Sequence, residues 1–144
     1  MGKRRQIQHQ LNRYSDAVNR RDWKALATLF AEDAIWEGMG ELVMRFEGRD
    51  AITHGFAVII EPMSMFVQMN APAVIEVHGD QASARSTIHE LGDVPADGTR
   101  FEIYGRYEDE LVRHKGEWLF HHRRFVPVTR QIVPIPVNDW GFRA

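Results

Sequence analysis

The sequence predicts an α+β fold in which three helices of the N-terminal half cover the concave face of a cone-shaped, curved sheet, antiparallel or mixed. Two observations lead to this prediction. Apolar residues follow helical spacing in much of the first 60 residues, whereas residues 65–128 read as a series of long strands. Helices followed by a meander of strands are typical of α+β domains, and a long sheet with helices on one face is expected to curl around an internal pocket.

The three helices have recognisable beginnings and ends. The first is predicted at residues 6–19, with one apolar stripe formed by Ile7, Leu11, Tyr14 and Val18. Asp22 is a suitable N-cap for a second, short helix. The third begins after Gly48, and Pro62 stops it because proline cannot continue the helical hydrogen bonding.

The strands separate into two groups. Two short strands, at residues 34–37 and around 42–46, lie between the second and third helices. Four long strands follow, at residues 65–78, 81–91, 99–114 and 117–128. Pro72 implies an edge position or a bulge in the first of these, since proline cannot donate to a sheet.

Composition excludes several functional classes. A formal net charge of −2 gives no basic surface for nucleic acid or an anionic membrane, and no apolar run reaches membrane-spanning length. The absence of cysteine excludes disulfides and thiolate metal sites, and it fits a reducing cytoplasm, where we expect this protein. We divide the 144 residues into a basic extension at 1–5, one domain at 6–130 and a C-terminal arm at 131–144.

Spaced motifs carry a family likeness. A first helix ending in Asn-x-x-Asp-Trp is followed by Leu-x-x-Leu-Phe-x-x-Asp-Ala-x-Trp, by Gly-Arg-x-Ala-Ile, and by Tyr107-x-Asp109, Arg113 and Gly116-x-Trp118. This order resembles the NTF2-like superfamily, and within it the SnoaL-like and scytalone-dehydratase-like group, over roughly residues 6–128. The resemblance implies the cone fold. It leaves the reaction open, because the fold hosts dehydratases, isomerases, dehydrochlorinases, dioxygenase small subunits and binding domains.

Alternation along the strands predicts which side chains face the pocket. In the strand 81–91, the small and apolar face consists of Ala82, Ala84, Ser86, Ile88 and Glu90. In the strand 99–114, the inward face consists of Phe101, Ile103, Gly105, Tyr107 and Leu111. Before Pro72, Val67 and Met69 are expected to point inward together.

The two faces of the last strand are equally amphipathic. One consists of Leu119, His121, Arg123 and Phe125, and the other of Trp118, Phe120, His122 and Arg124. The family resemblance favours the first set for the pocket. The second set would then join Tyr104 in a subunit interface on the convex face, where aromatic residues and arginine are commonly enriched. The resemblance thus implies a homodimer, with a trimer as the alternative because relatives form one.

The resemblance also shows which catalytic groups are missing. Dehydratases and dehydrochlorinases of the group pair an acid at the end of the first helix with a histidine on the first long strand, and these positions match Asn19 and Met69. Methionine cannot accept a proton, and asparagine cannot orient an imidazolium as a carboxylate does. The ketosteroid isomerase base matches Gly38 and its second acid matches Tyr107, so that mechanism is not expected either.

Tyr14, Tyr107, Glu90 and His121 remain as candidate catalytic residues. Tyr14 matches the oxyanion-stabilising tyrosine of ketosteroid isomerases, although a core tyrosine fits equally well. Glu90 on an apolar face would have a raised pKa, as a general base needs. For Glu90, the alternative is a glutamate at a strand end whose carboxylate reaches solvent. For His121, the alternative is a histidine on the protein surface. The expected pocket lining consists of Asn19, Trp36, Val67, Met69, Ser86, Ile88, Arg123 and Phe125.

These residues suggest a cofactor-free lyase or isomerase acting on a small apolar metabolite of cyclic, polyketide, steroid or aromatic type. Proton abstraction next to a carbonyl would be followed by proton return or loss of water. The alternatives are a non-catalytic ligand-binding or oligomerisation domain that has lost the dyad, and a small subunit of a ring-hydroxylating dioxygenase. No histidine and carboxylate spacing matches a metal site. We expect the tail to cover the cavity mouth with Trp140 or Phe142, as arms do in scytalone-dehydratase-like members.

Overall fold

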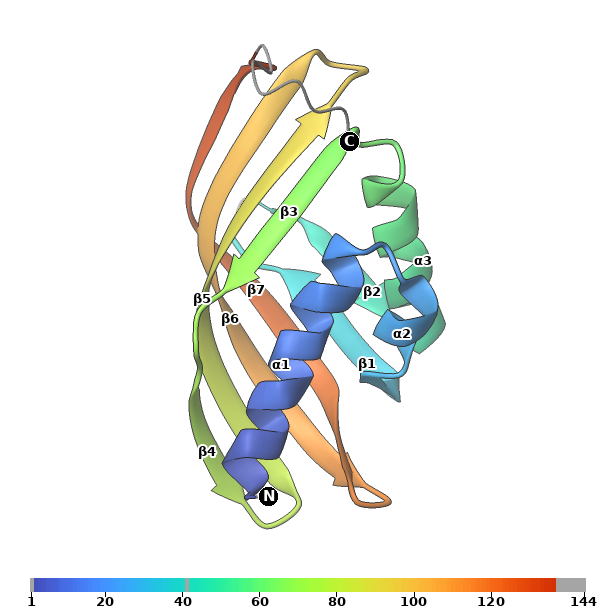
Figure 1. Cartoon of the computed structure of the whole chain (residues 1–144). Helices are drawn as coiled ribbons and strands as arrows, with labels where there is room; N and C mark the ends of the chain where they lie inside the picture. Colours follow the sequence, from blue (N-terminus) through green and yellow to red (C-terminus); the bar gives the residue numbers. More distant parts are fainter. Residues whose placement is uncertain (1, 41, 137–144) are drawn as a thin grey trace.

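A computed structural model describes residues 2–40 and 42–136, and this part of the chain forms three helices and one curved, unclosed sheet of seven strands. The helices are α1 (Lys3–Asn19), α2 (Trp23–Ala27) and α3 (Arg49–Ile60). The strands are β1 (Phe30–Gly38), β2 (Met44–Glu47), β3 (Met65–Asn70), β4 (Val74–His78), β5 (Gln81–Val94), β6 (Thr99–His114) and β7 (Glu117–Pro134). Figure 1 shows the helices together on one side of the sheet, which confirms the predicted fold class.

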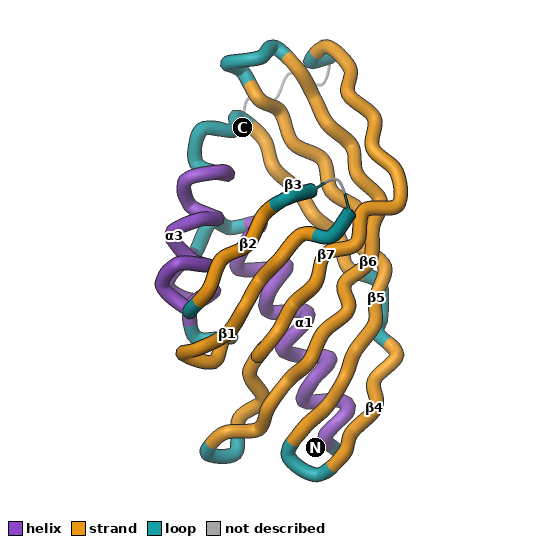
Figure 2. The backbone as a smooth tube through the Cα atoms, turned by 180° about the vertical axis from the view of Figure 1, so that it is seen from behind, coloured by secondary structure: helices purple, strands orange, loops and turns teal. Residues whose placement is uncertain are grey.

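The sheet has the order β2-β1-β7-β6-β5-β3, with β4 also paired to β5. Strands β1 and β7 run parallel, and the other pairs are antiparallel. Helix α1 lies across the concave face, while α2 and α3 stand beside β1 and β2 (Figures 1 and 2). Residues of α3, β5, β6 and β7 line a pocket on this side of the sheet.

The structure confirms the residues that were predicted to be buried in α1 and to precede α2 and α3. The apolar stripe of α1 is buried, and Asp22 caps α2 by accepting a hydrogen bond from the Ala25 backbone N–H at 3.0 Å. Gly48 precedes α3 with φ of 94°, a conformation that glycine adopts without strain. None of the helices in the described ranges is long and apolar enough to cross a membrane.

Pro72 divides the strand that was predicted at 65–78. Strands β3 and β4 both pair with β5, and the pairing stops after Asn70 and resumes at Val74, although the Ala71 N–H still donates to the Thr87 carbonyl at 2.8 Å. The N–H of Ala73 instead donates to the Gln8 side-chain carbonyl of α1 at 2.9 Å. The proline therefore ends one strand, and a helix side chain satisfies the next free donor.

The predicted facing of β3 is wrong by one residue. Gln68 pairs with Glu90 and Met69 pairs with His89, so Gln68 faces the concave side and Met69 the convex side. Gln68 is only 4% exposed, whereas Val67 and Met69 are 40% and 58% exposed. Apolar residues occupy both faces of this short strand, so its composition did not reveal its phase.

A bulge at His121 explains the ambiguous last strand. In the pairing of β6 with β7, Glu110 lies opposite His122 and Leu111 lies opposite Phe120, which leaves His121 as an extra residue. The facing pattern changes there. Trp118 and Phe120 are therefore buried, contrary to the predicted convex interface, and Arg123 and Phe125 are buried as well.

A second bulge lies further along β7. Tyr104 pairs with Thr129 and Gly105 pairs with Pro127, so Val128 is the extra residue. Strand β7 continues to Pro134 in register with β6, and the first residues of the predicted arm thus belong to the sheet. The predicted lid residues Trp140 and Phe142 lie outside the described part of the chain.

Candidate functional site

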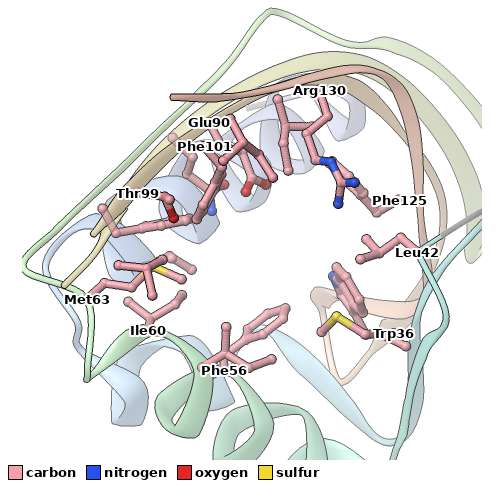
Figure 3. Close-up of a pocket in the computed structure, with 18 of the residues that line it drawn as sticks. Trp36, Leu42, Phe56, Ile60, Met63, Glu90, Thr99, Phe101, Phe125 and Arg130 are labelled. Atoms are coloured by element: carbon pink, nitrogen blue, oxygen red, sulfur yellow. The ribbon is translucent and has the colours of Figure 1, made fainter. Parts of the chain in front are cut away.

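The space inside the cone is a cavity of about 300 Å³, a size at the lower end of small-molecule sites (Figure 3). Its wall is mainly apolar and aromatic, with contributions from Trp36, Phe56, Ile60, Phe66, Phe101 and Phe125. Seven polar residues complete it: Tyr14, Gln68, Glu90, Asp97, Thr99, Tyr107 and Arg130. An apolar container with few polar groups suits a small, largely hydrocarbon ligand.

Two tyrosines meet at the inner end of the cavity. The hydroxyl oxygens of Tyr14 and Tyr107 are 3.1 Å apart, and each residue is 1% exposed. Burial raises the pKa of Tyr14 to about 12 and the pKa of Tyr107 well above its ordinary value, so both stay protonated at neutral pH. One hydroxyl donates to the other, and the second hydroxyl proton is left for an oxygen in the cavity.

Arg123 was predicted to line the cavity, but it lies behind the two tyrosines and is not part of the cavity wall. Its guanidinium carbon is 4.2 Å from the centre of the Tyr14 ring and 3.6 Å from that of Tyr107. It donates two hydrogen bonds to the Asp109 carboxylate, at 2.7 and 3.0 Å, and neither side chain is exposed. Burial raises the pKa of Asp109 and Arg123 opposes this, but two short parallel bonds indicate an ion pair.

Glu90 faces the cavity from β5, as the alternation predicted. Its carboxylate has no hydrogen-bond or ion-pair partner among the described residues, and burial raises its pKa to about 7. Tyr14, Tyr107 and Glu90 line the same cavity, and the charge of Glu90 also raises the pKa of both tyrosines. A carboxyl that titrates near neutrality beside two hydroxyl donors is suited to proton transfer.

His121 does not join this group. As the bulged residue it has a 45% exposed side chain, and its Nε2 lies 3.6 Å from the Asp33 carboxylate. The neighbouring His122 lies 2.8 Å from the Glu37 carboxylate and is not part of the cavity wall either. The described lining of the cavity thus contains no histidine, and the predicted convergence of Glu90 with His121 is wrong.

Asn19, which the resemblance matched to an acidic catalytic residue, has a structural contact. Its side-chain N–H donates to the Gln68 carbonyl at 2.9 Å, and its side-chain oxygen accepts from the Gln68 N–H at 2.8 Å. This pair of bonds joins the end of α1 to β3. The residue that faces inward beside Asn19 is therefore Gln68, whose amide cannot act as a base.

The other predicted lining residues divide into three groups. Trp36 and Phe125 line the cavity as expected. Ser86 and Ile88 are buried on the concave side but lie outside the wall, and Ser86 donates to the Asn70 side chain at 3.3 Å. Val67 and Met69 lie on the opposite side of the sheet for the reason given above.

Sequence reasoning missed Gln68, Asp97, Thr99 and Arg130. Arg130 was missed because the predicted strand ended at residue 128, and a continued alternation from Phe125 would have turned Arg130 outward. Pro127 was the signal available, since proline inside a strand commonly marks a bulge, and a bulge reverses the facing of every later residue.

The sequence matches the model of the SnoaL-like domain over residues 1–124. A protein of Novosphingobium aromaticivorans assigned as a scytalone dehydratase is 23% identical, with a TM-score of 0.80 over 97% of this chain and 93% of that one. An assigned aromatic ring hydroxylase of the same organism is 24% identical, with a TM-score of 0.81 over 92% of each chain. The hexachlorocyclohexane dehydrochlorinase LinA type 3 of Novosphingobium barchaimii is 20% identical, with a TM-score of 0.79 over 98% and 92%. At these identities the structures show a shared fold. A comparison with curated proteins finds no significant match.

Proposed function

Because the chain belongs to the SnoaL-like domain family, we propose that it is a cofactor-free lyase or isomerase that binds a small apolar metabolite inside the cone. Glu90 is the general base of this proposal, and the Tyr14–Tyr107 pair stabilises the developing oxyanion. His121 has no role in it, since its side chain lies outside the cavity. The proton that Glu90 takes is returned by Glu90 itself.

The chemistry starts from a ligand whose carbonyl oxygen accepts a hydrogen bond from the tyrosine pair. The Glu90 carboxylate removes a proton from the carbon next to that carbonyl, and the electron pair of the broken C–H bond moves to the oxygen as an enolate. Protonated Glu90 then gives the proton to another carbon, which completes an isomerisation. Alternatively it protonates a leaving hydroxyl group, which departs as water and completes an elimination.

The observation that carries the proposal is the state of Glu90. A partly buried carboxylate without a partner is desolvated at a cost to stability, and this supports a role for Glu90 toward a bound ligand. Its pKa of about 7 makes both the base and its conjugate acid available at neutral pH. No structural contact of the Glu90 carboxylate in the described ranges offers another explanation.

The second candidate function is a non-catalytic binding domain. It is favoured by the absence of histidine from the described lining and by the engagement of Asn19 with the β3 backbone. The reading as a dioxygenase small subunit requires a large partner subunit, and the likeness to the assigned ring hydroxylase supports the fold alone.

Deuterium exchange distinguishes the two candidates without knowledge of the natural substrate. We would incubate the protein in D₂O with 2-tetralone, an apolar cyclic ketone, and follow exchange of its α-protons by NMR. The catalytic proposal expects exchange above background, reduced at least about 100-fold by Glu90→Gln. Glu76→Gln, which alters an exposed glutamate of β4, is the matched control and should exchange like the wild type. Binding of 2-tetralone without exchange would support the binding domain instead.

A further inference from the structure

We propose that Arg130 forms a subsite for a carboxylate, so that the natural ligand is an apolar acid that carries this carboxylate in addition to the reacting carbonyl group. This inference rests on the proposed function and adds the class of ligand. The apolar body of the molecule would lie against the aromatic wall, and its carboxylate would bind the guanidinium. The carbon that loses a proton would lie on the side of Glu90.

The sheet register places Arg130 in one row with Glu90. Gln68 pairs with Glu90, Glu90 with Ile103, and Ile103 with Arg130, across β3, β5, β6 and β7. Residues opposite one another in antiparallel strands share a face, so all four side chains point to the concave side. Two strand spacings put the Glu90 and Arg130 backbones about 10 Å apart. A ring system that separates a carboxylate from a reacting carbon fits this distance.

The bulge at Val128 is what brings Arg130 inward. If Val128 were instead paired in regular alternation, Thr129 would follow Phe125 and Pro127 on the concave face and Arg130 would point outward. Figure 3 shows the guanidinium projecting into the cavity beside Phe125, with the Glu90 side chain on the neighbouring part of the wall. Arg130 thus faces the same space as the proposed base.

Arg130 is the only basic residue in the described lining, and it has no internal counterion there. Neither a hydrogen bond nor an ion pair joins it to Glu90, or to Asp97 in the turn that follows β5. Arg100, near the same end of the sheet, instead donates two bonds to Asp93, at 2.6 and 3.0 Å. Asp93 therefore neutralises the charge of Arg100 within the fold, whereas Arg130 remains available to the anionic group of a ligand.

A carboxylate is the anion that this surrounding favours. A guanidinium binds carboxylates through two parallel hydrogen bonds. Arg130 is an exposed residue, so a carboxylate bound to it stays in contact with solvent while the apolar body of the ligand lies against the aromatic wall. A doubly charged group would meet the Glu90 and Asp97 carboxylates in the same wall without a second cation to balance it. A single negative charge on an otherwise apolar molecule matches the one free cation of the described wall.

Two molecules of the same shape test the charge preference. We would measure binding of 2-naphthoate and 2-naphthamide by calorimetry near pH 6, where naphthoate is ionised and Glu90 is mostly protonated. The proposal expects the wild type to bind naphthoate at least about tenfold more tightly than naphthamide, a difference of about 1.4 kcal/mol. Arg130→Gln should remove the preference and leave naphthamide affinity unchanged. Arg106→Gln, on an exposed arginine of β6 paired with Glu108, is the matched control and should retain the preference.

Each other outcome has a distinct meaning. Equal binding of the two molecules by the wild type, or a preference that survives Arg130→Gln, would overturn the anion subsite while leaving the apolar pocket and its proposed chemistry standing. Failure of the wild type to bind either molecule would overturn the subsite together with the apolar pocket. Loss of naphthamide binding in Arg130→Gln would show that the variant damages the cavity itself, and would contradict a role restricted to charge.

Discussion

Arg123 and Asp109 form an ion pair with no exposed side-chain surface, and the same guanidinium lies against the rings of Tyr14 and Tyr107. The pair connects β6 to β7 behind the end of the cavity where Tyr14 and Tyr107 meet. Two hydrogen bonds fix the plane of the guanidinium, and the two rings rest on it. The position of the tyrosine hydroxyls therefore depends on a contact that lies outside the cavity wall.

Removing one charge of this pair should destabilise the fold strongly. Asp109→Asn leaves the Arg123 cation buried without a counterion, and we expect a loss of about 3–5 kcal/mol in the free energy of unfolding, measured in urea. Glu108→Gln breaks the exposed pair with Arg106 and is the control, with an expected loss below about 1 kcal/mol. Equal effects of the two substitutions would contradict a charged buried pair.

The tyrosine hydroxyls should be energetically coupled. Tyr14→Phe or Tyr107→Phe leaves the other buried hydroxyl without its partner, and each should cost about 1–2 kcal/mol of stability. The double variant should cost less than the sum by about 1 kcal/mol, since both single changes remove the same bond. Tyr104→Phe, on the convex face, should combine additively with Tyr14→Phe. A fully additive Tyr14 and Tyr107 cycle would show that the hydroxyls do not interact.

Glu90 should make stability depend on pH. Its pKa is raised from an ordinary 4.5 to about 7 in the folded protein, so the folded state holds the proton more tightly and stability falls as pH rises through this interval. Glu90→Gln removes this loss. We expect the variant to be more stable than the wild type by up to about 3 kcal/mol at pH 8 and nearly equal at pH 4.5.

Urea unfolding across this pH range measures the Glu90 effect. Glu76→Gln is again the control, and the difference between it and the wild type should not change with pH. A Glu90→Gln variant that is less stable than the wild type at pH 8 would show that the carboxylate has a stabilising partner, and the proposed role as a free base would then fail.

The carboxylate that the family resemblance led us to expect at position 19 cannot simply be introduced. In Asn19→Asp an ionised carboxylate would lose the donor to the Gln68 carbonyl and place negative charge beside that oxygen. We expect a loss of about 1–3 kcal/mol at pH 7. The loss should shrink below the pKa of the new carboxyl, where its proton can replace the missing donor. A pH-independent difference in unfolding free energy would contradict this account.

The expected homodimer has a smaller apolar surface than the sequence suggested. Trp118 and Phe120 are buried, and the convex face instead carries exposed Met69 beside the His89–Tyr104 ring stack, whose centroids are 4.2 Å apart. We expect light scattering to give twice the chain mass, and Tyr104→Glu to give the monomer mass. A trimer mass would support the alternative assembly, and a monomeric wild type would contradict both.

The parts of the fold with a regular period could be predicted from the sequence. Helix α1 keeps its apolar stripe through Leu11 and Tyr14 over several turns, and β5 keeps its alternation through Ile88 and Glu90 over several residues. These regular patterns correctly placed Tyr14 and Glu90 in the cavity wall. Strand β7 could not be predicted in the same way. Its two bulges change the facing at His121 and again at Val128, and a bulge is decided by pairing with β6 rather than by the composition of β7.

The extra residue at Val128 makes this part of β7 tolerant of a one-residue deletion. Without Val128, Pro127, Thr129 and Arg130 would still lie opposite Gly105, Tyr104 and Ile103, so the pairing would become regular and Arg130 would keep its facing. A lineage could thereby lose one codon at this site without changing which side chains reach the ligand. Protein engineers could shorten the strand there for the same reason.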